Sequence, residues 1–193
     1  MRKYFDKVAY NYERLLSQPL LHRLKEKEKC CILKFLDIKK RDKVLDAGCG
    51  IGFYSKIINS LGGESLGIDI SPKMVKVAKK NGIKALVVDL HSFALKQKFD
   101  KILCIGVLEF CQKPEVVIKN LNNHLKKGGD FIILFPKKSF PDYLYKLYHQ
   151  FHGIKIRLFE VNEMKRMLLS NGLQIIEMKN PTSLSCVINS KKQ

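Results

Sequence analysis

The chain has 193 residues, 46% of them hydrophobic, and no Pro-, Gly- or Ser-rich linker, so we expect one well-buried domain over residues 1–193. The N-terminus lacks the apolar segment of a secretory signal, and the longest apolar runs are strand-sized, so we expect a cytoplasmic protein without a membrane span. The six cysteines show no metal-ligand spacing, and we expect neither a disulfide nor a structural metal. The net charge of +18 comes from 36 Lys and Arg against 18 Asp and Glu, but the cations are nearly all dispersed lysines, which favours a solvated surface over a nucleic-acid-binding face.

Two helices are expected before the first strand. Apolar and aromatic side chains recur at helical spacing over residues 2–17, and Pro19 is typical of the first position of a second helix that runs to about Leu36. The charged run at 25–29 falls on the outer face of that helix, as is usual for a solvated surface. This pattern predicts an N-terminal helical cap over residues 1–42.

Residues 44–55, VLDAGCGIGFYS, are the stretch around which the chain is organised. A buried strand ends here, and a helix follows from Phe53. The turn between them holds three glycines, Gly48, Gly50 and Gly52. Glycine allows positive φ and lets a ligand approach the backbone closely. The dinucleotide fingerprint G-x-G-x-x-G is not met, because its third glycine would fall at Phe53, so the loop is a poor pyrophosphate cradle.

From residue 43 onward, strand and helix patterns alternate. We predict strands at 43–47, 64–69, 84–88, 100–105 and 129–135, separated by helices near 53–61, 72–81 and 114–125. Such alternation indicates parallel βαβ units with right-handed crossovers and a sheet covered on both faces. Ligands of an open sheet of this kind bind beyond the carboxyl ends of its strands, so we expect the chemistry at those ends.

Three acids follow three successive strand ends. Asp69 can accept hydrogen bonds from the two hydroxyls of a ribose, and we expect Ser71 to cap the helix that begins at Pro72, which leaves Asp69 free for the ligand. Asp89 can accept from an adenine amino group, and the backbone N–H after it can donate to a ring nitrogen. Glu109 follows the fourth strand, whose nearly apolar exit has backbone carbonyls that can face a cationic group.

Five segments resemble, in order, the motifs of class I S-adenosylmethionine-dependent methyltransferases. They are VLDAGCGIGFYS, GIDIS, VVD, FDKILCIGVLEF and LKKGGDFIILFP. The resemblance is strongest to the small-molecule branch that includes quinone-biosynthesis enzymes and magnesium-protoporphyrin methyltransferase. The two ends of the sequence resemble the same family. The N-terminal segment does so through Phe5, Asp6, Ala9 and Tyr12, and the C-terminal segment through a helix near 160–171 and strands near 173–179 and 184–190.

The resemblance implies an α/β, Rossmann-like fold. Its sheet has seven strands, the last one antiparallel and inserted beside the fifth, with helices on both faces. Residues 43–136 would form the cofactor-binding half, and residues 137–193 a lid helix and the C-terminal strands. The implied cofactor is S-adenosylmethionine, and no metal is required.

The resemblance also assigns cofactor contacts to ten residues. These are Tyr12, Asp46, Gly48, Gly50, Gly52, Asp69, Ile70, Asp89, Leu90 and Ile105. The glycines would approach the methionine part, with Asp46 orienting their loop and Ile105 offering its carbonyl to the methionine amine. Asp69 would hold the ribose, and the residue after it would flank the adenine. Asp89 and the residue after it would read the adenine edge, while Tyr12 either closes over the carboxylate end or is a core aromatic.

The sequence assigns neither the acceptor nor a catalytic residue. Residues 139–152 carry an aromatic-rich helical stripe, which we interpret as a helix packed on the domain; the alternative is a lid over an apolar acceptor pocket that docks at an anionic membrane surface. His149 and His152 lie in this segment, and we interpret them as rim residues rather than as bases.

The predicted function is transfer of a methyl group to an oxygen or carbon of a small, lipophilic or anionic molecule by in-line displacement. An RNA methyltransferase is one alternative, although the fourth strand ends in GVLEF and lacks the Asn/Asp-Pro-Pro-aromatic motif of amino-group methylases. A non-catalytic S-adenosylmethionine-binding or interaction subunit is the other, although the chain has kept the glycines and the acids. The oligomeric state stays open at this point.

Overall fold

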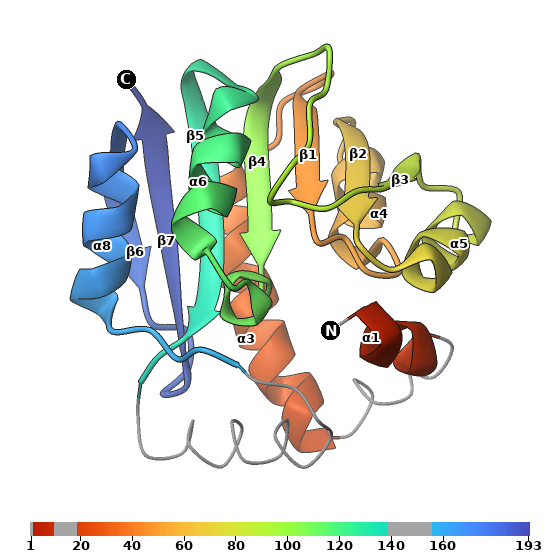
Figure 1. Cartoon of the computed structure of the whole chain (residues 1–193), viewed down its shortest axis with the longest axis horizontal. Helices are drawn as coiled ribbons and strands as arrows, with labels where there is room; N and C mark the ends of the chain where they lie inside the picture. The colour runs from red at the N-terminus through yellow and green to blue at the C-terminus, as the bar shows by residue number, and fades with distance from the viewer. Residues whose placement is uncertain (1, 10–18, 139–155) are drawn as a thin grey trace.

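The computed structural model of the chain describes residues 2–9, 19–138 and 156–193 (Figure 1). Its described helices are α1 (Arg2–Val8), α3 (Pro19–Leu36), α4 (Phe53–Ser60), α5 (Pro72–Lys80), α6 (Pro114–Asn123) and α8 (Val161–Ser170), with a 3-10 turn η1 (Leu108–Phe110). Its strands are β1 (Lys43–Ala47), β2 (Glu64–Asp69), β3 (Ala85–Val87), β4 (Phe99–Ile105), β5 (Leu125–Pro136), β6 (Leu173–Lys179) and β7 (Ser185–Lys192).

The seven strands form one sheet in the order β3-β2-β1-β4-β5-β7-β6. Strands β1 to β5 pair in parallel, whereas β7 runs antiparallel to both β5 and β6. This confirms the predicted α/β fold with its inserted antiparallel last strand. The strand order reverses between β1 and β4, so the crevice beyond the carboxyl ends of these two strands is where such a sheet binds its ligand.

β4 and β7 differ from their predicted bounds by one or two residues, and β5 and β3 differ for reasons that the pairing shows. β5 begins at Leu125, four residues before the expected start at 129, because its pairing with β4 is shifted: Phe99 faces Leu125, but Lys101 faces Asp130. The polar stretch at 126–129 therefore belongs to the strand although it lacks an apolar pattern. β3 covers only residues 85–87, since it pairs with β2 at three positions on the sheet edge.

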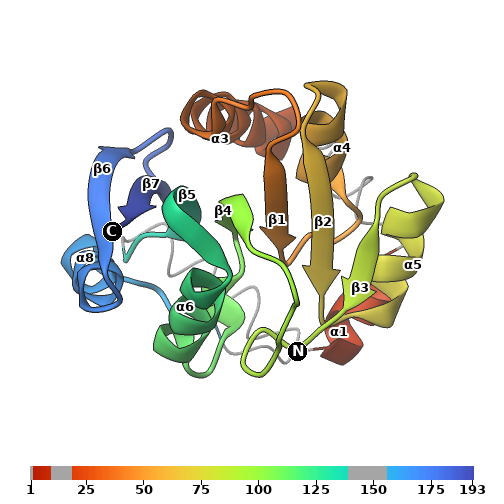
Figure 2. The same cartoon turned by 90° about the horizontal axis from the view of Figure 1, so that it is seen from above.

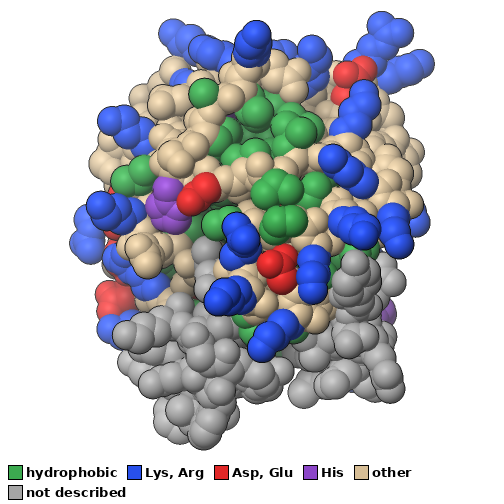
Figure 3. All heavy atoms as spheres, turned by 45° about the vertical axis from the view of Figure 1, so that its right-hand side comes forward, with side chains coloured by type: hydrophobic (Ala, Val, Ile, Leu, Met, Phe, Trp, Pro, Cys, Tyr) green, Lys and Arg blue, Asp and Glu red, His purple; other side chains and the backbone are tan. Residues whose placement is uncertain are grey.

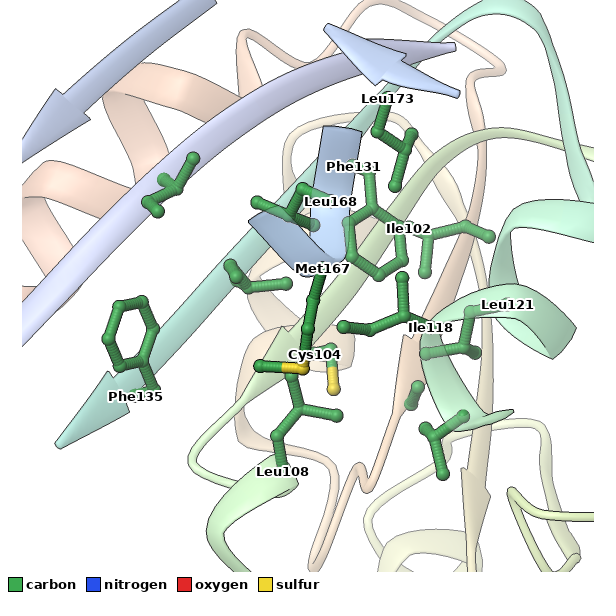
Figure 4. Packing of buried hydrophobic residues seen from close by; sticks show 14 of the residues in the cluster. Ile102, Cys104, Leu108, Ile118, Leu121, Phe131, Phe135, Met167, Leu168 and Leu173 are labelled. Atoms are coloured by element: carbon green, nitrogen blue, oxygen red, sulfur yellow. The ribbon is translucent and has the colours of Figure 1, made fainter. Parts of the chain in front are cut away.

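Helices cover both faces of the sheet, α3 and α4 on one and α6 and α8 on the other (Figure 2). On the first face, Ile32 and Leu36 of α3 are fully buried against Leu103 of β4. On the second face, Leu121 of α6 and Leu168 of α8 pack with the strands in a continuous apolar layer (Figure 4). Each such side chain contributes about 1.5–3 kcal/mol by burial, so the strand ends rest on a rigid support.

The surface agrees with the expected spread of lysines. On the face shown in Figure 3, Lys and Arg side chains are distributed around the molecule and are not gathered into one strip. Within the described ranges, no helix has both the length and the apolar content that crossing a bilayer requires. All six cysteines are free, and five of them are buried.

Candidate functional site

The glycine loop between β1 and α4 has positive φ at all three of its glycines, 75° at Gly48, 54° at Gly50 and 87° at Gly52. A Cβ added at Gly48 would lie 2.2 Å from Cγ2 of Val107, and one added at Gly52 would lie 2.8 Å from Cγ1 of Ile83. Packing therefore requires these two glycines. At Gly50 an added Cβ would meet nothing within 4 Å, so this part of the loop faces open space.

Asp46 supports the loop from behind. Its side chain is 3% exposed, and its Oδ2 accepts hydrogen bonds from the backbone N–H of Ser55 at 3.2 Å and from the Ser55 hydroxyl at 2.6 Å. Burial raises the pKa of Asp46 to about 6, and the two bonds from Ser55 oppose that rise. Because Ser55 lies in the first turn of α4, these bonds join the end of β1 to the helix and fix the shape of the loop.

Asp69 is not free, in contrast to the expectation from the sequence. Its Oδ2 accepts from the backbone N–H of Gly50 at 2.9 Å, and its Oδ1 accepts from the backbone N–H of Ser71 at 2.8 Å. Burial raises the pKa of Asp69. Ser71 does cap α5, as predicted, by accepting from the Met74 N–H at 3.1 Å. Each carboxylate oxygen can accept a second hydrogen bond, so Asp69 can clamp the loop and still accept from two hydroxyls.

Asp89 forms a unit with His91. Oδ1 of Asp89 accepts a hydrogen bond from the backbone N–H of His91 and lies 2.9 Å from Nδ1 of the same residue. These bonds lower the pKa of Asp89. An ionised carboxylate only accepts, so Nδ1 carries a proton, and in the tautomer that has this single proton Nε2 is an acceptor. That Nε2 is buried and has no partner among the described residues. Sequence reasoning missed His91, although its place two residues after a strand-end acid was a signal.

These groups meet in one pocket beyond the carboxyl ends of β1, β2, β3 and β4. Seven of the ten predicted cofactor residues line it, namely Gly48, Gly50, Asp69, Ile70, Asp89, Leu90 and Ile105. Asp46 lies behind the loop, and Gly52 lies in the loop but packs against Ile83, so neither is among the pocket-lining residues. Tyr12 lies outside the described residues, as do His149, His152 and the aromatic stripe at 139–152.

The pocket also has lining residues that the sequence had not assigned. Phe5 reaches it from α1, which packs beside α5 at this end of the sheet (Figure 1). The ring of Phe5 meets that of Phe110 edge to face, with centroids 5.2 Å apart. Val107 and Cys111 complete this apolar wall. The segments that supply these residues were recognised as motifs, but no periodicity indicates which of their side chains turn toward the ligand.

Glu109 is the third strand-end acid, and it lies in η1 beside the pocket. Its side chain is 3% exposed, and its Oε2 has no hydrogen-bond partner in the described part of the chain. Burial raises the pKa of Glu109 to about 7. The enclosure therefore favours the neutral form of this carboxyl group.

The chain matches the family described as "Methyltransferase domain" over residues 45–133. An uncharacterized protein of Methanocaldococcus jannaschii is 37% identical over 135 residues, which are 68% of this chain and 50% of that protein. The ubiquinone biosynthesis O-methyltransferase of Pelagibacter ubique is 30% identical over 151 residues, 75% of this chain and 63% of that enzyme. The chain spans about half the length of the curated relatives it matches.

Solved structures share the whole fold. The crystal structure of magnesium protoporphyrin IX methyltransferase from Synechocystis PCC 6803 with bound SAH has a TM-score of 0.80 at 20% identity, and the match covers 100% of this chain and 98% of that one. A methyltransferase structure from Thermotoga maritima has a TM-score of 0.79 at 23% identity and covers 100% and 99% of the two chains.

Proposed function

The chain belongs to the class I S-adenosylmethionine-dependent methyltransferases, and from that membership we propose that it transfers a methyl group from S-adenosylmethionine to an oxygen or carbon of a small, lipophilic or anionic molecule. The observation that carries the proposal is the pocket in which the glycine loop, Asp69, Asp89 and Ile105 meet at four adjacent strand ends. These residues come from separate motifs, and the fold brings them to one place.

The pocket fits the parts of S-adenosylmethionine one by one. The open side of Gly50 leaves room for the methionine chain, and the remaining acceptor positions of Asp69 suit a ribose diol. Among the described residues, Nε2 of His91 and Oδ2 of Asp89 have no hydrogen-bond partner, and both suit an adenine amino group, which has two N–H donors. When bound, this cofactor supplies a methyl group on a positively charged sulfur, already activated for transfer.

The chain's own residues then have two tasks, which are to position the acceptor and to exclude water. Ile70, Met74 and Leu90 give the nucleoside end an apolar lining, with Met74 and Leu90 buried. Phe5 and Phe110 add a pair of packed rings to the pocket wall, and Phe5 packs against the cluster that contains Met74. A dry site favours the dispersal of the sulfonium charge as the methyl group leaves.

The names of the relatives support a lipophilic acceptor, because two of them act on a ubiquinone precursor or a protoporphyrin according to their names. The same proposal includes contact with an anionic membrane surface through the surface lysines, where such an acceptor would be found. Co-sedimentation with phosphatidylserine vesicles at low salt tests this contact, and we expect 0.5 M salt to release the protein.

Calorimetric titration with S-adenosylmethionine tests the proposal. We expect saturable binding by the wild type and at least tenfold weaker binding by Asp69→Ala, because the variant loses both the ribose acceptor and the clamp on the Gly50 N–H. Asp100→Ala is the matched control, since Asp100 accepts from Lys43 and Lys126 at the opposite ends of the strands. Absence of binding to the wild type, or undiminished binding to Asp69→Ala, would refute the proposal.

A further inference from the structure

Strand β3 forms one edge of the sheet, and its pairing leaves one side of the strand open. Among the described strands, β2 is its single neighbour. The carbonyl of Lys84 and the N–H of Val88 bond to the backbone of β2. Alternate residues of a strand direct their N–H and C=O groups to opposite sides, so those of Ala85 and Val87 point to the open edge.

The side chains at this edge are apolar and exposed. Leu86 is 42% exposed and Val87 is 53% exposed, and they point to opposite faces of the sheet because successive side chains of a strand alternate. Val87 shares a groove with α5, whose lining residues are Pro72, Val75, Lys76, Lys79, Lys80 and Val87. Figure 3 brings this side of the molecule forward and shows apolar side chains near the centre of the face, with Lys and Arg side chains around them.

The opposite edge of the sheet, β6, is protected in a way that β3 is not. A bulge between Ile175 and Glu177 interrupts the pairing of β6 with β7, and Glu177 forms an ion pair with Lys179. Bulges and charged side chains prevent another chain from pairing with an edge. β3 is short, but its three residues pair with β2 in regular register and none of them is charged. Its edge is therefore open to a further strand.

Lysines surround this edge. Lys76, Lys79 and Lys80 line the groove, Lys84 directly precedes β3, and all four are exposed. In the described part of the chain, none of the four forms an ion pair. Their charge attracts an acidic partner and opposes a second copy of this chain, because two copies would bring the same lysines together and each has a net charge of +18.

We propose that β3 and α5 form a docking surface for an acidic, extended segment of a partner protein, which adds to the sheet as a strand beside β3. Backbone bonds to Ala85 and Val87 hold the segment, its acidic side chains meet the lysines of the groove, and its apolar side chains cover Leu86. A nucleic acid supplies negative charge but no strand that can pair with the edge, so the open backbone groups favour a protein.

The docking surface adjoins the cofactor pocket without overlapping it. The described lining residues of the groove and those of the pocket have no member in common, although Asp89 of the pocket follows Val87 by two residues. A docked segment and S-adenosylmethionine can therefore be bound at the same time. The docking surface does not depend on the proposed function, and either can fail without the other.

Fluorescence anisotropy with a labelled peptide tests the docking. The probe is a seven-residue peptide of alternating glutamate and valine, which places its glutamates on the lysine side of the edge and its valines on the Leu86 side. At low salt we expect saturable binding to the wild type. A peptide of the same composition, with four glutamates followed by three valines, should bind at least about fivefold more weakly. Equal binding of the two peptides, or no saturable binding of the alternating one, would overturn the proposal.

Val87→Pro removes the N–H that points to the open edge and leaves the bonds to β2, which involve the alternate residues. Val87→Ala is the matched control, because it also loses the valine side chain but keeps the N–H. We expect the proline variant to bind the alternating peptide at least about fivefold more weakly than the alanine variant does. Similar affinities of the two variants would exclude strand addition at β3.

A charge variant provides a second measurement in case Val87→Pro folds poorly. Lys79→Glu/Lys80→Glu should weaken binding of the alternating peptide at least about tenfold at low salt. Lys119→Glu/Lys127→Glu has the same net charge and changes exposed lysines on α6 and β5, so it should bind nearly as the wild type does. Equal losses in the two double variants would contradict a specific surface. A wild-type dimer in analytical ultracentrifugation that Val87→Pro abolishes would assign the edge to a second copy and overturn the proposal.

Discussion

Two regions around the pocket treat their acids in opposite ways. Where Asp69 and Asp89 line the pocket, hydrogen bonds from backbone N–H groups and from His91 orient the carboxylates. Beside the pocket, Glu109 is buried, and its Oε2 has no hydrogen-bond partner among the described residues. Hydrogen bonds to a carboxylate favour its ionised form, whereas burial with few such bonds raises the pKa, as it does for Glu109.

Gly48 lines the pocket and packs against Val107, and its replacement should have the largest effect. Gly48→Ala places a methyl group 2.2 Å from Val107 in a backbone with φ of 75°. Strain and overpacking together should lower the free energy of unfolding by roughly 3 kcal/mol and abolish S-adenosylmethionine binding, as measured by urea unfolding and calorimetry.

Gly172→Ala is a matched control for that prediction. Gly172 has a φ of 73°, and a Cβ there would meet nothing within 4 Å, so the variant carries the backbone strain without the clash. We expect a loss of about 1 kcal/mol and unchanged binding. Equal losses in the two variants would show that the contact with Val107 is unimportant.

The second prediction concerns the pH dependence of stability at Glu109. The pKa of Glu109 rises from its ordinary value of 4.5 to about 7 on folding, so its contribution to stability is present in full below pH 4.5 and is lost as the pH rises through 7. Glu109→Gln avoids this loss. It should equal the wild type near pH 4.5 and be more stable by about 3 kcal/mol at pH 8. Urea unfolding at several pH values checks this, with Glu64→Gln, at an exposed acid at the start of β2, as the control, and a pH-independent difference would contradict it.

The third prediction concerns the nucleoside end, where Ser71 connects three elements. Its Oγ accepts from the Met74 N–H at 3.1 Å and donates to Oδ1 of Asp6 on α1 at 2.6 Å. Ser71→Ala should lower the free energy of unfolding by about 1 kcal/mol through loss of the cap. The pKa of Asp6, which this hydrogen bond lowers, should rise toward its ordinary value in an NMR titration.

Ser60→Ala removes a hydroxyl that bonds only to the Ile57 carbonyl at the exposed end of α4. Its stability should stay within about 0.5 kcal/mol of the wild type. If Ser71→Ala behaved in the same way and the pKa of Asp6 did not move, the hydrogen bonds of Ser71 to Met74 and Asp6 would not stabilise the nucleoside end of the pocket.

The smallest expected effect is at His91. His91→Ala removes the Nε2 acceptor in the pocket and the donor that orients Asp89. Affinity for S-adenosylmethionine should fall about three- to tenfold, equivalent to one hydrogen bond, with little change in stability. His22→Ala, an exposed histidine on α3, should bind like the wild type. An unchanged affinity of His91→Ala would remove this residue from the site.

Most of the binding end could be predicted because its signals are local. The glycine spacing marks the loop, and Asp69 and Asp89 could be expected to line one pocket because the last residues of parallel strands lie at one edge of the sheet. The second role of Asp69 could not be predicted, since its bond to the Gly50 N–H joins residues 19 positions apart. The sequence did not identify His91, Phe5 and Val107 as lining residues for the same reason. The direction of their side chains depends on neighbours that are distant in sequence.

The sequence by itself determined the α/β class, the course of the strands and the loop that approaches the ligand, because apolar periodicity and glycine spacing act over a few residues. Only the tertiary structure decided which side chains keep a free hydrogen-bonding position. Asp69 and Glu109 both follow parallel strands, yet backbone N–H groups meet one and an apolar enclosure surrounds the other. Burial and hydrogen-bond partners come from packing between distant segments, and they set the pKa of each of these carboxyl groups.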